Sequence, residues 1–317
     1  MKPDVSVIIV NYNTREMTLK CLDALRADLT GINAEVILVD NASSDGSVEA
    51  IRAHAPWVQV IASEKNLGFG AGNNVGLKIA QGDYFLLLNT DALPHAGAIQ
   101  ALLTYMQTHP KTAVVGPRLL NADGSVQQSC FRFPTPLRSW LENLWISAIL
   151  RRVPAIDDYR GWAHDREREV DFVIGACVMV RRSVYEQIGG FDERFFMYAE
   201  ESDWMYCMHR AGWTISFTPS AVVTHLGGAS GASDKPKINQ IFFESLDHYE
   251  LKHHGVAGLV SLRAAMTIGC GLRAALWTLV MAASRKRRTL ARSKVRVSRW
   301  LMIRQMTSWN ILSRASA

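Results

Sequence analysis

The chain has 317 residues, of which 48% are hydrophobic and 20% charged, so it can bury a full core and fits one large α/β domain or one domain plus a substantial appendage. Its five cysteines are scattered, odd in number and without a C-x-x-C pair, which argues against a disulfide framework or a zinc site. Thirteen of the 35 basic residues but none of the 29 acidic residues lie after residue 250, which leaves 22 basic and 29 acidic residues, a net −7, before it. A main domain of that charge does not fit a protein that grips nucleic acid.

The first 120 residues predict strands and helices in alternation. Apolar runs with the length and β-branched content of strands begin at Val5, Glu35, Val58, Tyr84 and Ala113. Helical stretches lie between them, near residues 16–26, 47–53, 71–80 and 97–107. This alternation predicts an α/β fold with a mostly parallel sheet flanked by helices. Ligands of such sheets bind beyond the carboxyl ends of the strands, where Asn11, Asp40 and residues 89–91 stand.

The segment VDNASSDGS, residues 39–47, places an aspartate at the end of a predicted strand. Asp40 can accept a hydrogen bond from the imide N–H of uracil or thymine, a proton that cytosine lacks. Asp, Asn and Ser also favour helix caps and turns, so Asp40 can equally cap the helix that follows. From this segment alone the two interpretations are even.

The segment NLGFGAGNNVG, residues 66–76, places four glycines and three asparagines at a loop that leads into a helix. Free backbone N–H groups at a helix start suit a diphosphate. The segment is not a Walker loop, because the G-K-[ST] ending is missing, nor a dinucleotide fingerprint, because it follows the third strand. The alternative is that its glycines serve only close packing.

The segment LLLNTD, residues 86–91, runs from a buried strand into two polar side chains, Asn89 and Asp91. Two such oxygen ligands, with two from a diphosphate, would hold a hard divalent cation, although Asn-x-Asp also favours a plain turn. His225 ends another apolar strand, and a lone histidine is more often structural than a ligand. Combined with Asp91 it would form an N/O site that suits Mn²⁺ as well as Mg²⁺.

The segment FFMYAEESDW, residues 195–204, gathers three carboxylates after an aromatic run. On a helix Glu200 and Asp203 share a face, whereas Glu201 points about 100° away. An acidic first turn also complements the helix dipole, which is the structural alternative. Aromatic neighbours would partly desolvate these carboxylates and favour a general base.

In order and spacing these segments resemble the family 2 glycosyltransferases, the inverting enzymes of the Rossmann-like GT-A fold, over residues 5–254. VSVIIVNYN, VDNASSDGS, NLGFGAGNNVG and LLLNTD are similar to the family's nucleotide half. GACVMVRR, GGFDERFFMYAEESDW and HLGGAS are similar to its acceptor half. The sequences FRFPTP and FFMY-x-E most resemble those of the rhamnosyltransferase-like branch, which builds bacterial cell-surface polysaccharides from dTDP-rhamnose.

The resemblance implies that Asp40 contacts the nucleobase, that Asp91 holds the metal of a D-x-D-type motif, and that His225 is a further metal ligand. It implies that the Glu-Asp pair of the acceptor helix supplies the base. The sequence departs from the family's pattern at two places. Asn89 stands where D-x-D has its first aspartate, and Glu200–Glu201 stands where the family has its Glu-Asp pair. We expect Glu201 to be the base, and Asp203 and Glu200 are the next candidates for this role. Further candidates for nucleotide binding are Asn11, Asn13, Asn66, Gly72, Asn73 and Asn89.

We expect a catalytic domain over residues 1–254, with a nucleotide half over 1–120 and an acceptor half over 121–254, and a helical tail over 255–317. Residues 256–284 are apolar, but Arg263 and Arg273 leave uncharged stretches shorter than the roughly 18–20 residues that span a bilayer. RKRR follows at residues 285–288. An amphipathic segment with a basic flank favours a helix on an anionic membrane surface. The alternative is packing on the core or on a second subunit.

The predicted function is inverting transfer of a sugar, with rhamnose from dTDP-rhamnose as the first candidate and UDP-sugars as the second. The predicted cofactor is Mg²⁺ or Mn²⁺, and the acceptor is a hydroxyl of a polyprenyl-linked or oligosaccharide substrate at the cytoplasmic face of the membrane. A catalytically silent sugar-nucleotide or carbohydrate binding protein is the alternative, and Asn89 favours it. A dinucleotide oxidoreductase is disfavoured, because the first strand leads into VNYNTRE rather than a glycine-rich turn. The hypothesis requires Asp91 and residues 200–203 to open on one pocket.

Overall fold

The computed structural model describes residues 2–150, 153, 156, 159, 161–227 and 235–307. The chain divides into two units. The α/β unit comprises Met1–Phe133 and Trp162–Ser245, and the helical unit comprises Pro134–Gly161 and Leu246–Ala317. The end of the predicted tail, residues 308–317, lies outside the described residues.

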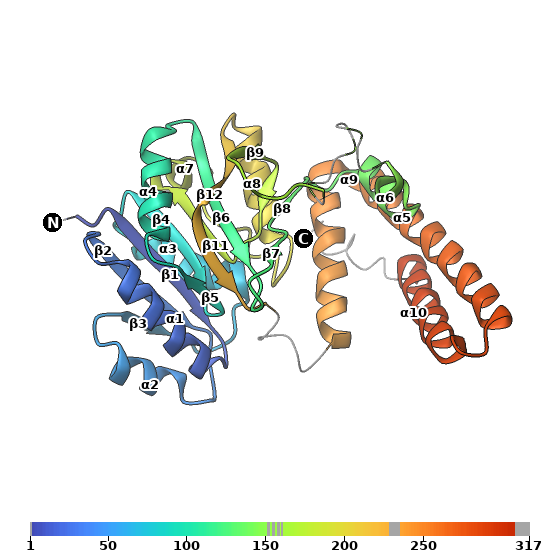
Figure 1. The fold of residues 1–317 in the computed structure, drawn as a ribbon, viewed down its shortest axis with the longest axis horizontal. Helices are drawn as coiled ribbons and strands as arrows, with labels where there is room; N and C mark the ends of the chain where they lie inside the picture. The colour runs from blue at the N-terminus through green and yellow to red at the C-terminus, as the bar shows by residue number, and fades with distance from the viewer. Residues whose placement is uncertain are drawn as a thin grey trace. The chain divides into compact units, whose positions relative to one another are not determined.

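Four parallel strands form one half of a ten-stranded sheet in the α/β unit (Figure 1). Their order is β3-β2-β1-β4, and apolar, β-branched runs form them as predicted. Asn11 lies opposite Asp40, and Val10 lies opposite Asn89, so the polar residues that end these strands meet at one edge. The strands are β1 (Val5–Asn11), β2 (Ala34–Asp40), β3 (Gln59–Ala62) and β4 (Tyr84–Asn89).

The other half of the sheet is mixed. Strand β11 runs antiparallel between β4 and β6, and β12 runs parallel to β6 but antiparallel to β5 and β9. A separate pair is formed by β8 and β10. The bounds are β5 (Ala92–Pro94), β6 (Thr112–Leu120), β7 (Val126–Gln127), β8 (Cys130–Phe131), β9 (Arg168–Val170), β10 (Phe172–Val173), β11 (Cys177–Arg181) and β12 (Thr214–His225).

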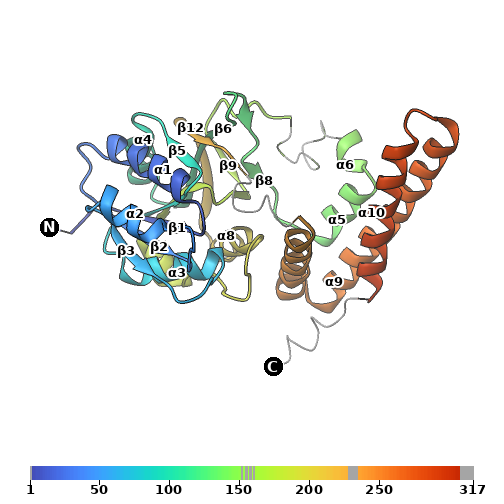
Figure 2. The same ribbon diagram turned by 90° about the horizontal axis from the view of Figure 1, so that it is seen from below.

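Helices cover both faces of the parallel strands, because successive side chains of a strand point to opposite faces. Val7 and Ile9 join the core under α1 and α4. Ile8 meets α3 on the other face, where a Cβ on Gly76 would lie 2.6 Å from its Cγ2. Figure 2 shows α3 on the opposite side of the strands from α1 and α4. The predicted α/β architecture is confirmed. The helices of this unit are α1 (Arg15–Asp28), α2 (Ser47–His54), α3 (Phe69–Ile79), α4 (Ala98–Thr108), α7 (Arg182–Ile188) and α8 (Glu200–Arg210), with the start of α9 (Lys235–Ala283).

The helical unit contains α5 (Pro136–Asn143), α6 (Ile146–Ile149), the remainder of α9, and α10 (Arg288–Thr307). Helix α9 kinks at Gly255, whose φ of 66° is left-handed. Helix α5 lies so close to α9 that a Cβ on Gly269 would be 2.6 Å from the carbonyl oxygen of Asn143. The indole N–H of Trp140 also donates to Ser261 Oγ at 3.0 Å. These contacts fix α5 to α9.

The division of the chain therefore differs from the predicted boundary after residue 254. The units separate after Ser245, and residues 134–161 belong with the C-terminal helices rather than with the acceptor half. The reason is physical: α9 is a long helix that begins well before residue 254, and it provides the surface on which α5 packs.

The helical unit buries charge and exposes apolar side chains. Asp247 Oδ2 accepts hydrogen bonds from Arg263 Nη2 at 2.9 Å and from Arg304 Nη2 at 3.4 Å, and all three side chains are buried. Of the 22 exposed large apolar side chains in the described part of the chain, 16 belong to this unit. One helical segment among the described residues, Asn239–Ala283, is long and apolar enough to cross a membrane, with a mean hydropathy of 1.5, although 44% of its most apolar stretch is buried.

Candidate active site at the carboxyl edge of the sheet

Strand pairing places His225 beside Asp91. His225 lies opposite Ala92 in the β5–β12 pair, and the N–H of Leu226 donates to the Asp91 carbonyl at 2.9 Å. As a result His225 Nε2 is 3.3 Å from Asp91 Oδ1, with side chains only 13% and 9% exposed. The two residues predicted to form an N/O cation site thus face one another. The segment that follows, residues 228–234 with the end of HLGGAS, lies outside the described residues.

A cysteine lies next to this pair but does not present a ligand. Cys21 Sγ is 3.3 Å from the carbonyl oxygen of Ala92 and 3.5 Å from that of Asn89. Burial, together with the charge of Asp91, raises the pKa of the Cys21 thiol to about 12. The thiol is therefore protonated at neutral pH, and Asp91 and His225 remain the candidate ligands.

Asn11 and Asp40 form the buried base of the neighbouring loops. Asn11 Nδ2 donates to Asp40 Oδ1 at 2.6 Å, and the N–H of Ser43 donates to Asp40 Oδ2 at 2.9 Å. Asn11 Oδ1 accepts hydrogen bonds from the hydroxyls of Thr14 and Thr18 at 2.7 Å each. Asp40 is 1% exposed and closes its own loop rather than capping α2.

The loop after β1 presents two more exposed residues. Asn13, at a left-handed φ of 52°, accepts the N–H of Ser44 through its Oδ1 at 2.7 Å. The intervening Tyr12 is 40% exposed. Sequence reasoning did not single out Tyr12, although an aromatic residue between two asparagines at a strand end is a usable signal.

The glycines before and within α3 serve close approach. Asn66 Oδ1 accepts the N–H of Gly68 at 2.9 Å, and the N–H of Phe69 donates to the carbonyl of Phe196 at 2.9 Å. A Cβ on Gly68 would lie 2.1 Å from that carbonyl oxygen, and one on Gly72 would lie 2.9 Å from Val10 Cγ1. The loop around residue 196 therefore covers part of the first turn of α3.

Asn73 lies inside this helix rather than at its rim. It is 1% exposed, and its Nδ2 donates to the carbonyl of Phe69 at 3.0 Å. Packing, the alternative interpretation of the glycines in the segment 66–76, accounts for Gly68 and Gly72.

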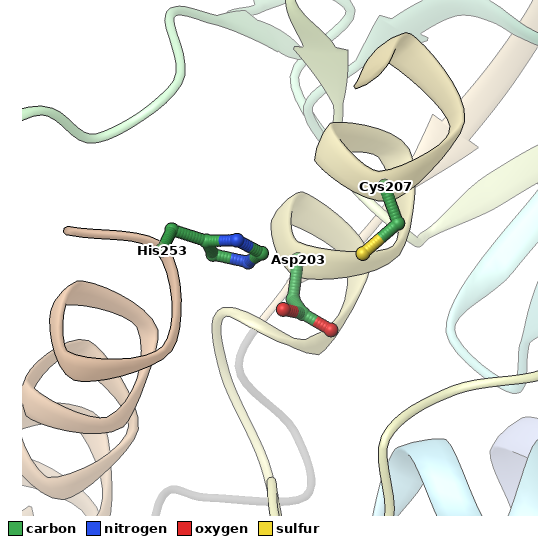
Figure 3. A group of neighbouring side chains, drawn as sticks. All are labelled: Asp203, Cys207 and His253. Carbon is green, nitrogen blue, oxygen red and sulfur yellow. The ribbon is translucent and has the colours of Figure 1, made fainter. Parts of the chain in front are cut away.

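Helix α8 begins after two left-handed residues, Tyr198 at φ 70° and Ala199 at φ 63°. Neither is a glycine, so this turn holds strain immediately before the acidic residues. Asp203 is 2% exposed and points to the same side of α8 as Cys207, with a carboxylate oxygen within 4.8 Å of Sγ (Figure 3).

The two adjacent glutamates of α8 differ in exposure. Glu200 is 3% exposed, and burial followed by the charge of Glu201 raises the pKa of its carboxyl well above the ordinary value. Glu201 is half-buried. Burial also raises the pKa of Glu201, while a hydrogen bond from the backbone of Gly175 opposes that rise. Burial thus favours the protonated form of Glu200 more strongly than that of Glu201, whose side chain is partly exposed although its Oε2 atom is buried.

A short backbone segment connects Glu201 to the turn at residues 89–91, which carries the candidate metal ligand Asp91. The N–H of Gly175 contacts the Glu201 carboxylate, and a Cβ on Gly175 would lie 3.7 Å from Glu201 Cβ. The next carbonyl, that of Ala176, accepts the N–H of Asn89 at 2.9 Å. The structure therefore brings Glu201 and the turn at residues 89–91, which are more than 100 residues apart, to the same edge of the sheet.

The fold is the GT-A fold of glycosyltransferases. The structure is similar to that of the mannosyltransferase PcManGT from Pyrobaculum calidifontis in complex with GDP-Man and Mn²⁺, with a TM-score of 0.58 and 16% identity over 98% of this chain and 88% of that one. It is also similar to GalNAc-T7 with UDP, GalNAc and Mn²⁺, with a TM-score of 0.56 and 16% identity over 78% of this chain and 47% of that one. At such low identity the likeness establishes the fold.

Residues 6–189 match the model of glycosyl transferase family 2, so the chain belongs to that family. It is 34% identical over 204 residues to an N-acetylglucosaminyl-diphospho-decaprenol L-rhamnosyltransferase of Mycobacterium tuberculosis, covering 60% of this chain and 66% of that one. It is 32% identical over 215 residues to the low-salt glycan biosynthesis hexosyltransferase Agl10 of Haloferax volcanii, covering 66% of this chain and 63% of that one. The chain thus spans slightly less than two thirds of each relative.

Proposed function

We propose that the chain is an inverting glycosyltransferase that moves a sugar from a nucleotide diphosphate donor to an acceptor hydroxyl. The observation that carries this proposal is the connection of Glu201 to Asn89 through Gly175 and Ala176. It brings a candidate base and a candidate metal site to one edge of the sheet, as a displacement needs when both reactants are held in line. Membership of family 2 supports the reaction class.

Asp91 and His225 fit a divalent cation, Mg²⁺ or Mn²⁺. Their facing atoms, an oxygen and a nitrogen 3.3 Å apart on two different segments, form a preorganised pair of mixed hard and borderline ligands. Such a cation, when bound, stabilises the negative charge that develops on a departing diphosphate. Asn89 adds a neutral ligand or a donor to a phosphate oxygen, so the protein supplies one negative charge fewer than two acids would.

Glu201 is the proposed general base. It is the half-buried member of its pair, and burial raises its pKa toward the range where a carboxylate accepts a proton efficiently. Its carboxylate removes the proton of an acceptor hydroxyl as that oxygen attacks the anomeric carbon, and the bond to the nucleotide diphosphate breaks on the opposite face of the sugar. Glu200 and Asp203 are buried. They would therefore support the position of Glu201 and would not themselves accept the proton.

The nucleotide is proposed to bind at the loops that follow β1 and β2. Asp40 and Asn11 are buried, so they would hold these loops in place beneath the nucleotide. Tyr12 and Asn13, which are exposed there, would contact the base or ribose. Rhamnose from dTDP-rhamnose is the first donor to test, because one relative carries L-rhamnosyltransferase in its name.

We propose a lipid-linked or polysaccharide acceptor and a position on the cytoplasmic face of a membrane. Sixteen exposed large apolar side chains of the helical unit, together with thirteen basic and no acidic residues after residue 250, suit an anionic bilayer surface. Five of the apolar residues come from the segment 134–161, so the membrane surface includes more than the predicted tail: Leu137, Trp145, Ile149, Leu150 and Val153.

A donor screen tests the proposed reaction. The full chain is incubated with dTDP-rhamnose, UDP-sugars and GDP-sugars, each with Mg²⁺ or Mn²⁺ and with polyprenyl-diphosphate-linked N-acetylglucosamine, and the release of nucleotide is measured. We expect release with one donor class that EDTA abolishes. The second candidate, a silent binding protein, is favoured by Asn89, and saturable binding of a nucleotide sugar without any release would support it instead.

A further inference from the structure

The second ring nitrogen of His225, Nδ1, contacts the side chain of Gln127. His225 Nδ1 is 2.7 Å from Gln127 Oε1. An amide oxygen only accepts hydrogen bonds, so the proton of this bond must lie on Nδ1. A neutral imidazole with its proton on Nδ1 has a lone pair on Nε2, the atom that faces Asp91 Oδ1.

The distance on the other side of the ring agrees with this assignment. If Nε2 carried a proton toward the Asp91 carboxylate, the bond would be charge-assisted, and such N–H···O bonds are about 2.7–2.9 Å long. The observed Nε2···Oδ1 distance is 3.3 Å. The two atoms thus face one another as two electron-pair donors, which is the arrangement of two ligands of one cation.

Gln127 is itself held in the orientation that this contact requires. Its Nε2 donates to Asn121 Oδ1 at 2.9 Å and more weakly to the carbonyl of His225 at 3.4 Å, which turns Oε1 toward the ring. Asn121 is fixed in turn by donating its Nδ2 to Ser125 Oγ at 2.9 Å. The β6–β7 pairing places Gln127 opposite Leu119 and anchors this hairpin in the sheet.

We propose that Gln127 is a positioning residue for the cation site: it holds the proton of His225 on Nδ1 and so directs the Nε2 lone pair to the point that Asp91 also faces. Partners of this kind, behind a metal-bound histidine, set both its tautomer and its orientation. The proposal rests on the cation site of the proposed function, but the tautomer exists without any metal and is tested separately.

The first test is the tautomer of His225 in the metal-free full chain. Long-range ¹H–¹⁵N correlation spectra of histidine-labelled protein are recorded at about pH 8, above the ordinary histidine pKa of about 6.5. Comparison with His225→Gln identifies the signal. We expect a neutral ring protonated on Nδ1 in the wild type and in Gln127→Glu, which keeps an acceptor. In Gln127→Leu we expect the proton to move to Nε2, toward Asp91.

The second test is Mn²⁺ affinity, measured by electron paramagnetic resonance titration. Gln127→Leu should weaken Mn²⁺ binding by about 10–100-fold, the range seen when a partner behind a metal ligand is removed. Gln127→Glu should restore most of that affinity. Gln128→Leu is the matched control, because Gln128 directs its amide to the Cys130 carbonyl instead, and it should bind Mn²⁺ like the wild type.

The outcomes separate the two proposals. A wild-type ring protonated on Nε2 or on both nitrogens, or a Gln127→Leu variant with unchanged tautomer and Mn²⁺ affinity, would overturn the role of Gln127 and leave the cation site standing. A wild-type chain that binds no Mn²⁺, with or without nucleotide, would overturn the cation site of the proposed function together with any positioning role toward it.

Discussion

Glu200 and Glu201 are adjacent on α8 and carry the same functional group, but the side chain of Glu200 is buried and that of Glu201 is half-buried. The helical periodicity of the sequence predicted that Glu200 and Asp203 share a face and that Glu201 points elsewhere, and both of the first two are buried. The sequence could not reveal which face would be covered, because that depends on distant segments such as α3, where a Cβ on Gly70 would lie 3.6 Å from Glu200 Cβ.

The raised pKa of Glu201 predicts the pH dependence of the reaction. A general base must be deprotonated, so kcat/KM should fall as the pH falls through the pKa of Glu201 in the free enzyme. Because burial raises that pKa, the midpoint of the fall should lie above the ordinary glutamate value of about 4.3. A profile of kcat/KM measured from about pH 4 to 9 checks this, and a midpoint at or below the ordinary value would contradict it.

The role of Asp40 shows the limit of reading single residues. The sequence left a base contact and a helix cap equally open, and the structure gives a third arrangement, in which Asp40 ties Asn11 and Ser43 together. Only the parallel pairing of β1 with β2 makes that arrangement possible, because it places Asn11 opposite Asp40. The pairing of His225 with Asp91 likewise depends on a short strand, β5, which the sequence did not predict.

At the scale of elements, the start of α3 depends on the loop that precedes α8. Gly68 has a φ of 85°, and its missing side chain makes room for the Phe196 carbonyl, which accepts the N–H of Phe69. The glycine-rich segment thus couples the nucleotide half to the acidic helix. The sequence predicted a helix here, but glycine spacing alone could not distinguish packing against a distant loop from phosphate binding.

This coupling predicts that Gly68→Ala is strongly destabilising. A Cβ 2.1 Å from a backbone oxygen cannot be accommodated without moving one of the two segments. Gly31→Ala is the matched control, because Gly31 has the same φ of 85° with nothing within 4 Å of a Cβ. The control should lose about 1 kcal/mol for its backbone conformation, and Gly68→Ala should lose at least about 2 kcal/mol more. Urea unfolding measures both, and equal losses would contradict the close contact.

At the scale of the whole molecule, composition predicted two parts with different partners. The contacts divide the chain at other points than the predicted boundary, because residue patterns show where a helix is apolar but not what packs on it. Helix α5 lies in the segment 134–161, yet its partner α9 begins about 100 residues later. Small residues such as Gly269 mark that packing surface only once the two helices are seen together.

The charge of the helical unit predicts selective binding to anionic membranes. The full chain should sediment with vesicles that contain phosphatidylglycerol and much less with phosphatidylcholine vesicles. Replacing Arg285, Lys286, Arg287 and Arg288 by Gln should remove about 1 kcal/mol of binding for each charge near the surface. The matched control replaces four exposed basic residues of the α/β unit, namely Lys20, Arg52, Lys65 and Lys78. Equal loss of binding in both quadruple variants would contradict a surface confined to the helical unit.

The measurement that tests the proposed site most directly is the rate of sugar transfer by two single variants of α8. Glu201→Gln removes the proposed base and should lower kcat by about 10²–10⁴-fold. Burial raises the pKa of the Glu200 carboxyl well above the ordinary value and so favours its neutral form; Glu200→Gln, a neutral side chain of similar shape, should therefore keep kcat within a few-fold of the wild type. Both variants should retain wild-type circular dichroism. Full activity in Glu201→Gln, or a large loss in Glu200→Gln alone, would contradict Glu201 as the group that activates the acceptor.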